Sequence, residues 1–284
     1  MTAGAALDAA RVGRDGDLNL RFERRGPATV VAGCRYTLPL QVLAPVALDD
    51  PAAIVSILNP TGGLVGGDRL SIDVRAGAGA HALLTTPSAT RVYRTDGEPT
   101  VQTVSLSVGR GAVVEWVPDH TIPFAGSALR QAIDVKLDES AGLILVDAFS
   151  AGRIALGEAW RFAALESAVL VRDGGGPLLH DRFVLRGAGP RGPALDGLGF
   201  TESCPYFASI AVFGAFDRDR FAAEVDRLGT GAEARLGAAV LPRGGVLVRC
   251  LAPTAPALVD AIDGCWRLAR RALLGLPPPA LRKG

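Results

Sequence analysis

Three acidic residues lie inside strongly apolar segments of the chain: Glu115 in AVVEWVP, Asp147 in ILVDAFS and Glu158 in ALGEAW. A carboxylate is costly to bury unless a cation or hydrogen-bond donor accompanies it. The commoner outcome is that each acid pairs with an arginine or faces out of a strand. The candidate arginines are Arg94, Arg153 and Arg161. The functional alternative is that the acids line a polar cavity or channel, in which hard oxygen donors relay a divalent cation.

A second unusual segment is NPTGGLVGGDR, which places two glycine pairs directly before an acid-base pair. Its residues of interest are Gly62, Gly63, Gly66, Gly67, Asp68 and Arg69. Glycine reaches positive φ without steric penalty but loses much entropy when fixed. The segment therefore either bends sharply or lets something approach its backbone closely. A P-loop has Lys-Ser/Thr where Asp68-Arg69 stand, and a Rossmann turn opens a helix whereas a strand follows here. We predict a structural turn or a partner-contacting loop.

The histidines and cysteines of the sequence are not spaced as the ligands of a permanently occupied metal site are. The three histidines (His81, His120, His180) have no i, i+4 partner, and the four cysteines form no CxxC pair. We expect four buried, reduced thiols. Transient metal handling needs fewer ligands than storage does, and Asp119-His120 in a turn could serve it.

Catalytic motifs are equally sparse, because no G-x-S-x-G elbow is present. A triad assembled from distant residues stays open, so a hydrolase or transferase is the alternative function. It would require a pocket in which a perturbed acid contacts a nucleophile. A ligand-binding β module would need exposed aromatic residues, and aromatic residues make up only 6% of the chain.

Composition narrows the class of partner. Of the 284 residues, 49% are hydrophobic and the net charge is +1. This composition indicates either apolar surface hidden against a partner or a chain that is poorly soluble alone. Balanced charge gives no case for nucleic acid. The longest apolar runs, such as Ala141–Ala151, fall short of a membrane span, and the N-terminus has no apolar signal core. We therefore expect a cytoplasmic protein without a membrane partner.

These residues must be positioned by short strands, which dominate from Asp17 onward. Alternating or continuous apolar runs are separated by turn residues at short intervals, and this pattern is typical of an all-β core. The predicted strands include Tyr36–Val42 and Trp160–Val171. Similar short segments, Gly77–Ala80, Gly109–Ala112 and Ser140–Leu143, recur about 31 residues apart, each before an apolar strand. That recurrence indicates layered, coil-like stacking.

Helices are predicted only late in the chain, at Asp217–Leu228, Thr230–Ala239 and Pro253–Leu276. A returning strand, Gly244–Leu251, lies between the last two. In the final helix the apolar residues Leu258, Ile262 and Trp266 are expected on one face. Three arginines, Arg267, Arg270 and Arg271, are expected on another face.

Several ordered motifs carry a family resemblance. They are NPTGGLVGGDRLSIDV, GAHALLTTPSATRVYRT, VVEWVPDHTIPFAGSALRQ (similar to E-W-x-P-x-x-T-I-x-F), DAFSAGRIALGEAWRF (similar to G-R-x-x-x-G-E) and CWRLARRALLGLPPPALR. Together they span roughly Asp17 to Pro279, and the chain resembles the UreD (UreH) family of urease accessory proteins. Two features depart from the family. The chain ends in ALRKG, and His120 stands where the family often has a different polar residue.

The resemblance implies a scaffold rather than an enzyme. Such a protein binds UreF directly and UreG through UreF, and it docks on apo-urease for assembly of the dinickel centre. Nickel would pass through it transiently along an internal channel, with no cofactor permanently bound. The implied fold is mainly β (α+β), with layered, helically wound sheets and a few helices near the C-terminus. We expect a single domain over residues 1–284, with flexible ends at 1–16 and 280–284.

The resemblance also suggests residue roles. The candidate nickel-channel acids are Asp68, Glu115, Asp147 and Glu158, and Arg153 is expected to pair with one of them. The glycine loop, which is the best-matching motif, is expected to shape an interior turn or a partner surface. The last helix is expected to contribute Leu258, Trp266 and its arginines to the UreF contact, although Trp266 fits the core equally well.

Overall fold

The computed structural model describes residues 14–43, 50–187, 195–197 and 199–281. Its strands are β1 (Asp15–Arg25), β2 (Ala28–Tyr36), β3 (Gln41–Val42), β4 (Ala53–Leu58), β5 (Arg69–Ala76), β6 (His81–Thr85), β7 (Thr90–Val92), β8 (Thr100–Val108), β9 (Val113–Val117), β10 (Thr121–Pro123), β11 (Ala128–Leu137), β12 (Gly142–Ser150), β13 (Ala164–Asp173), β14 (Gly176–Arg186), β15 (Tyr206–Phe213), β16 (Arg235–Val240) and β17 (Val246–Ala252). The helices are η1 (Ile154–Leu156, a 3₁₀ turn), α1 (Arg218–Thr230) and α2 (Ala255–Leu274).

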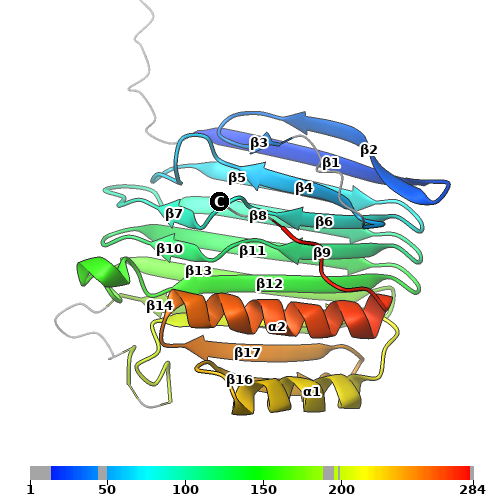
Figure 1. The fold of residues 1–284 in the computed structure, drawn as a ribbon. Coiled ribbons are helices and arrows are strands. Elements are labelled where there is room, and N and C mark those ends of the chain that lie inside the picture. The colour runs from blue at the N-terminus through cyan, green and yellow to red at the C-terminus, as the bar shows by residue number, and fades with distance from the viewer. Residues whose placement is uncertain (1–13, 44–49, 188–194, 198, 282–284) are drawn as a thin grey trace, which may run out of the picture.

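Two sheets lie face to face. The first has the order β14-β13-β11-β8-β5-β1-β2, and the second runs β16-β17-β15-β12-β9-β6-β4-β3. In the middle of the chain successive strands alternate between the sheets, and each strand pairs in parallel with the equivalent strand one coil later (Figure 1). The central coils therefore form a β-solenoid, and the predicted mainly β, helically wound architecture with late helices is confirmed.

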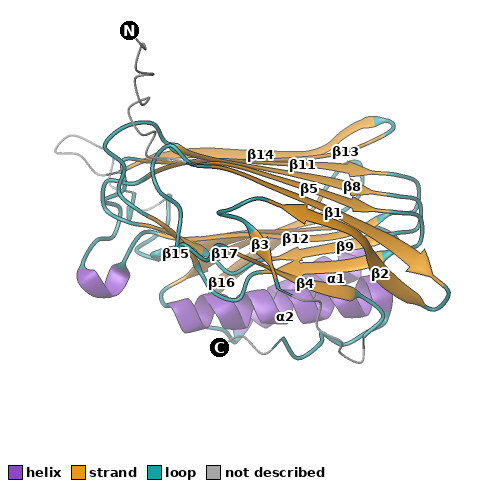
Figure 2. Cartoon of the chain, turned by 90° about the horizontal axis from the view of Figure 1, so that it is seen from above, coloured by secondary structure: helices purple, strands orange, loops and turns teal. Residues whose placement is uncertain are grey.

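Alternation along the strands separates two apolar layers (Figure 2). One cluster fills the space between the sheets and includes Leu20, Val104 and Leu145. The other joins the outer face of the second sheet to α1 and α2 and includes Ile144 and Leu258. Because successive strand residues point to opposite faces, neighbouring residues of β12 supply both layers, and this explains why all nine of its residues are buried.

Both helices have N-caps that the sequence supplies. The Asp217 carboxylate accepts a hydrogen bond from the backbone N–H of Arg220 at the start of α1, and Thr254 accepts one from Ala257 at the start of α2. The helix α2 ends at Gly275, whose φ of 67° suits glycine. Neither described α-helix has the length and apolar character that crossing a membrane requires.

Three local predictions were wrong. Thr230–Ala239 is not a second helix, because α1 ends at Thr230 and β16 pairs along β17. Glycine at 231 and 237 weakens helix formation there. The segment Tyr36–Val42 is not one strand either, since residues 37–40 form a turn containing Pro39, which lacks an N–H for a ladder. The strand predicted from Trp160 begins only at Ala164.

The ends and the cysteines also differ from expectation in detail. Residues 1–13 and 282–284 lie outside the described residues, while β1 already begins at Asp15 and Leu281 packs against the helix-side cluster. The four cysteines are free, but Cys34 is exposed rather than buried. It lies on β2, at the edge of the first sheet, where side chains on one face meet solvent.

Candidate functional site

Asp147 is the predicted acid that lies in the space between the two sheets. It projects from β12 on the inward side and is 8% exposed. Its Oδ1 accepts a hydrogen bond from Gln131 Nε2 at 2.8 Å, and its Oδ2 accepts one from Ser167 Oγ at 2.8 Å. Gln131 Oε1 in turn accepts one from Gln102 Nε2 at 3.2 Å. Strands β8, β11 and β13 of the facing sheet supply these three polar side chains.

Burial controls the titration of Asp147. The pKa of its carboxyl is raised to about 6, chiefly by desolvation and to a smaller extent by the charge of Asp181. The hydrogen bonds from Ser167 and Gln131, and the nearby Arg249, act in the opposite direction. The group therefore titrates close to neutral pH, which is unusual for an aspartate.

Asp147 lines two cavities. The polar cavity, of about 70 Å³, also contacts Gln102, Gln131 and Thr121. It is large enough for a few water molecules. The aromatic cavity, of about 350 Å³, lies against Phe149, Trp160, Phe183 and Phe207. Arg249 lies on its wall and donates to both oxygens of Asp181 at 2.8 and 2.6 Å.

A third cavity shares lining residues with the polar one. This helix-side cavity, of about 330 Å³, lies between α2 and the turn that carries His120, and it shares Pro118 and Asp119 with the polar cavity. Burial lowers the pKa of His120, and Asp119 partly offsets this effect. Asp147 lines both the polar and the aromatic cavity, and Asp119 lines both the polar and the helix-side cavity. We call this set of three neighbouring cavities the interior passage.

Asp68 holds a turn instead of lining the interior passage. It is 2% exposed, its Oδ1 accepts from the backbone N–H of Arg14 at 2.9 Å, and its Oδ2 accepts from Val65 N–H at 2.9 Å. Its backbone oxygen accepts from Val101 N–H at 2.8 Å. These contacts join the start of β1 and β8 to the glycine loop, so Asp68 stabilises local structure and lines none of the three cavities.

The glycine loop is packed tightly against neighbouring loops. Gly62 and Gly67 have φ values of 86° and 83°, which glycine adopts without strain. A Cβ on Gly63 would lie 2.6 Å from Tyr93 Cε2, and one on Gly66 would lie 2.6 Å from Thr95 Cβ. Arg69 begins β5. The loop forms a close structural contact at one end of the solenoid.

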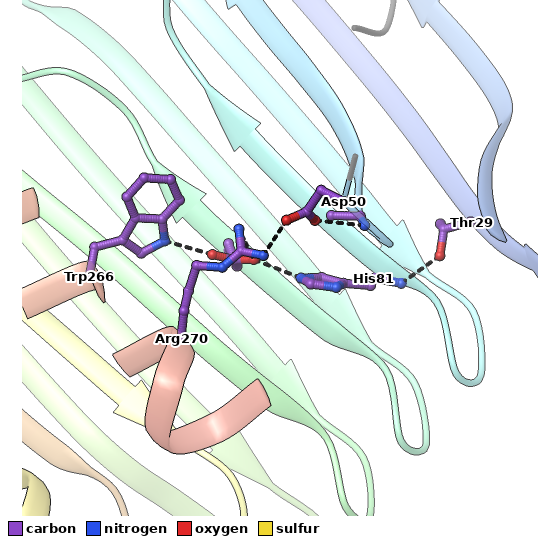
Figure 3. A network of polar contacts seen from close by, with 7 residues as sticks. Thr29, Asp50, His81, Trp266 and Arg270 are labelled. Carbon is purple, nitrogen blue, oxygen red and sulfur yellow. Dashed lines mark hydrogen bonds and ion pairs between the residues drawn. The ribbon is translucent and has the colours of Figure 1, made fainter. Parts of the chain in front are cut away.

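Glu115 lies on the helix side of the second sheet, where it contacts Trp266 and Arg270 of α2. Figure 3 shows these two side chains together with His81 and Asp50. Glu115 is fully buried, and its Oε1 lies 2.7 Å from His81 Nε2, while its Oε2 accepts from Trp266 Nε1 at 2.6 Å. Arg270 Nη1 is 3.3 Å from Glu115 Oε1, and Arg270 Nη2 donates to Asp50 Oδ2 at 2.6 Å. Glu115 therefore pairs with α2 and not with the interior passage.

Arg270 and Trp266 are core residues of α2. Arg270 is fully buried, so it lies on the same face as Leu258 and Trp266, and the prediction that placed it on another face with Arg267 and Arg271 was wrong. The spacing of four residues from Leu258 through Ile262 and Trp266 to Arg270 was the signal that could have placed it. Its guanidinium lies 5.6 Å from the centre of the Trp266 ring.

Glu158 and Arg153 pair with each other. Arg153 Nε donates to Glu158 Oε2 at 2.7 Å, and Arg153 Nη2 donates to Oε1 at 2.5 Å. This contact holds the pKa of Glu158 below its usual range. The pair braces the turn after β12 and lines none of the three cavities.

Of the four predicted acids, the structure thus brings only Asp147 into the interior passage. Sequence reasoning missed Gln131 and Ser167, although both occupy inward positions of alternating strands and are polar among apolar neighbours. The described residues contain no group of three or more His, Cys, Asp or Glu side chains arranged to hold a metal ion.

Known proteins resemble the chain over nearly its whole length. The family of the UreD urease accessory protein matches residues 14–283. The urease accessory protein UreD of Deinococcus radiodurans is 36% identical over 284 residues, with 99% of each chain covered. That of Alkalilimnicola ehrlichii is 34% identical over 278 residues, covering 97% of this chain and 94% of the relative. That of Haloarcula marismortui is 31% identical over 274 residues, covering 95% and 91%.

Proposed function

The chain belongs to the UreD family of urease accessory proteins, and from this premise we propose that it is a cytoplasmic scaffold that helps load nickel into urease. In this proposal it binds UreF directly and UreG through UreF, and the assembly docks on apo-urease. The protein holds no permanent cofactor, and nickel is its transient cargo. Neither nucleic acid nor membrane takes part.

The observation that carries the nickel part of the proposal is the position of Asp147. Its carboxylate lines both the polar and the aromatic cavity, and the polar cavity shares Asp119 with the helix-side cavity. A small hydrated cation passing between the sheets would meet carboxylate, amide and hydroxyl oxygens in succession. Few ligands at each point suit transit, because a complete ligand set would retain the ion.

Burial makes Asp147 suited to reversible binding. A carboxylate with a pKa of about 6 is partly protonated near neutral pH. A passing cation then competes with a proton for the Asp147 carboxylate, so the cation binds there more weakly. The hydrogen bonds from Gln131 and Ser167 fix the orientation of the carboxylate.

The test is urease maturation in a host that expresses the urease structural and accessory genes. Deleting the gene for this chain is expected to leave abundant urease that contains little nickel and has little activity. Asp147→Ala is expected to lower the nickel content of urease while the chain still co-purifies with its partners. Asp134→Ala is the matched control, because Asp134 is 42% exposed and pairs with Arg172 on the outer face of the first sheet.

Two outcomes would contradict the proposal at different levels. Urease that is fully loaded without the gene would exclude the accessory role. Unchanged nickel content with Asp147→Ala would exclude the interior passage and leave the scaffold role standing.

One contact favours the alternative of a hydrolase or transferase. Ser167 Oγ donates to Asp147 Oδ2 at 2.8 Å beside a cavity, so a hydroxyl contacts an acid of raised pKa. Membership of an accessory-protein family weighs against this reading. Turnover of an ester or amide substrate by the purified chain, abolished by Ser167→Ala, would support it.

A further inference from the structure

The inward face of the second sheet carries a row of polar side chains across the inter-sheet apolar cluster. Asp147 of β12, Ser209 of β15 and Arg249 of β17 are cross-strand neighbours, because the register pairs Asp147 with Ser209 and Ser209 with Arg249. Opposed residues of antiparallel strands place their Cβ atoms about 5 Å apart. A single strand therefore separates Arg249 from the buried carboxylate.

The facing sheet carries a matching row. Gln102, Gln131 and Ser167 occupy equivalent positions in β8, β11 and β13, and hydrogen bonds join this row to Asp147. Polar groups inside an apolar layer are costly unless they are hydrogen-bonded. We call the six residues of the two rows the polar belt.

Arg249 ends the polar belt at the edge of the inter-sheet space. Its side chain is 53% exposed. It donates to Ser209 within the belt and to both carboxylate oxygens of Asp181 on β14, at 2.8 and 2.6 Å. Because β14 is the edge strand of the first sheet, this ion pair spans the gap between the two sheets. We call the contact between Arg249 and Asp181 the seam pair.

The seam pair lies at the exposed side of the aromatic cavity. Arg249, Ser209 and Asp147 all line that cavity, and Asp147 is its buried acid. The charges of the seam pair reach this acid, since Arg249 lowers the pKa of Asp147 and Asp181 raises it. A cation that approached Asp147 from this edge would therefore meet a fixed positive charge first.

We propose that the seam pair is a latch over the aromatic cavity, and that Arg249 controls the access of cations to Asp147 from this edge. While Asp181 holds the guanidinium in place, the arginine covers the edge and repels positive charge. An ion pair with an exposed arginine contributes little to stability, so Arg249 can turn into solvent at small cost. The inference deepens the proposed function by assigning a control residue to the route of the ion, and it rests on that function only for the identity of the cation.

A purely structural role makes a different prediction. Arg243, in the turn between β16 and β17, forms a second contact across the same gap. It donates to Asp173 Oδ1 at 2.9 Å and to Pro177 O at 2.8 Å. Arg243 lines none of the three cavities. If such contacts only hold the sheet edges together, then loss of either arginine should loosen the region to a similar extent. A latch predicts that only the loss of Arg249 opens the cavity.

The experiment measures how fast a reagent reaches position 147 in the purified chain. Asp147→Cys is introduced together with Cys34→Ser, because Cys34 is exposed while the other three cysteines are buried. Two methanethiosulfonate reagents of similar size, one carrying a trimethylammonium group and one neutral, then modify the introduced thiol. Rates are compared with Arg249 intact, with Arg249→Ala and with Arg243→Ala as the matched control, and the Tm of each variant is recorded.

Arg249→Ala is expected to raise the rate of the cationic reagent by about tenfold, which corresponds to removing one unit charge near the route. The neutral reagent is expected to gain less, and Arg243→Ala is expected to change neither rate. A second variant closes the edge. Arg249→Met combined with Asp181→Leu replaces the ion pair by an apolar contact and is expected to slow both reagents. These opposite signs distinguish a latch from a general loss of stability.

Each other outcome overturns the latch. Equal rates with and without Arg249 would show that reagents reach position 147 by another way, such as the helix-side cavity. An equal increase with Arg243→Ala, or an increase in the double variant, would show a general loosening of the sheet edges. These results would leave the proposed function intact, because the measurement uses neither nickel nor urease. Urease that is fully loaded without this chain would instead refute the proposed function and leave the latch standing as a property of the fold.

Discussion

Asp147 carries its charge between two sheets at an energetic cost. Gln131 and Ser167 donate to its two oxygens, yet desolvation outweighs them and raises the pKa to about 6 from 3.8. The native state therefore binds this proton more tightly than the unfolded chain does. Keeping an ionised carboxylate there at neutral pH reduces the stability of the fold, as is common at sites retained for function.

The pH dependence of stability follows from that difference. As pH rises from about 4 to about 6, the unfolded chain ionises at this residue first, so this group lowers the free energy of unfolding, by roughly 3 kcal/mol in all. Below about pH 4 the carboxyl is protonated in both states and costs no stability, and above about pH 6 the loss of stability is constant. Asp147→Asn removes the titration and is expected to raise the Tm at pH 7 and to flatten the profile between pH 4 and 6.

Thermal unfolding of the wild type and of Asp147→Asn across that pH range measures the effect. Asp134→Asn is the control, since Asp134 lies on the exposed outer face. Identical slopes for the wild type and Asp147→Asn would mean that the carboxyl titrates near its ordinary pKa.

Residue identity alone did not reveal which acids share a site. The sequence does not distinguish the surroundings of Glu115 from those of Asp147, because each lies among apolar residues. Continuous apolar runs do not disclose which side faces the partner sheet and which faces the helices. The cation that joins Glu115 is Arg270, far along the chain, and no local pattern links the two. The pairing of Glu158 is local, and an arginine partner for it was anticipated.

At the scale of elements, the glycine loop shows how backbone contact replaces side-chain packing. Gly66 faces Thr95 in the loop between β7 and β8, and a Cβ there would also lie 3.2 Å from Glu98 O. A branched side chain must push these two loops apart. The sequence correctly indicated that the glycines allow a close approach, but not which loop approaches.

Gly66→Val is expected to destabilise the protein by about 1–3 kcal/mol, because it overpacks this contact. Gly97→Val, in the same neighbouring loop, is the matched control, since nothing lies within 4 Å of a Cβ at Gly97 and its φ is not positive. Denaturant unfolding of both variants measures the difference. A Gly66→Val protein as stable as Gly97→Val would mean that the two loops do not pack closely in solution.

Elements were predicted best where turn residues and alternation repeat, and worst where one element meets another. Strands β5, β8 and β11 alternate cleanly, and glycine-bearing turns mark the coils. The helix predicted after α1 was wrong. That segment forms strand β16 because it pairs with the distant strand β17, and its own helix propensity does not decide its conformation.

At the scale of the whole molecule, the helix layer joins the solenoid through both apolar and ionic contacts. The helix-side cluster surrounds Arg270, whose guanidinium lies between Asp50 and Glu115. Its Nε and Nη1 make no hydrogen bond with any described residue. A buried ion pair of this kind contributes little net stability, but removing one partner leaves an uncompensated charge.

Arg270→Met is therefore expected to destabilise the protein by about 3–5 kcal/mol, because Glu115 and Asp50 stay buried without their cation. Arg271→Met, which removes an exposed pair with Glu224, is expected to cost less than about 1 kcal/mol. Calorimetry of the two variants makes the comparison. Equal Tm values would show that the network is solvated or that the carboxylates are protonated in the native state.

The network around Glu115 also has a consequence for biosynthesis. Trp266, which donates to Glu115, lies 151 residues further along the chain, so a ribosome needs roughly 8 to 30 seconds to supply it. During that interval the nascent sheet presents an apolar face to solvent, and Glu115 lacks its partners Trp266 and Arg270. Any interruption of translation before the last helix leaves that face uncovered, which makes truncated chains natural targets for chaperones and proteases.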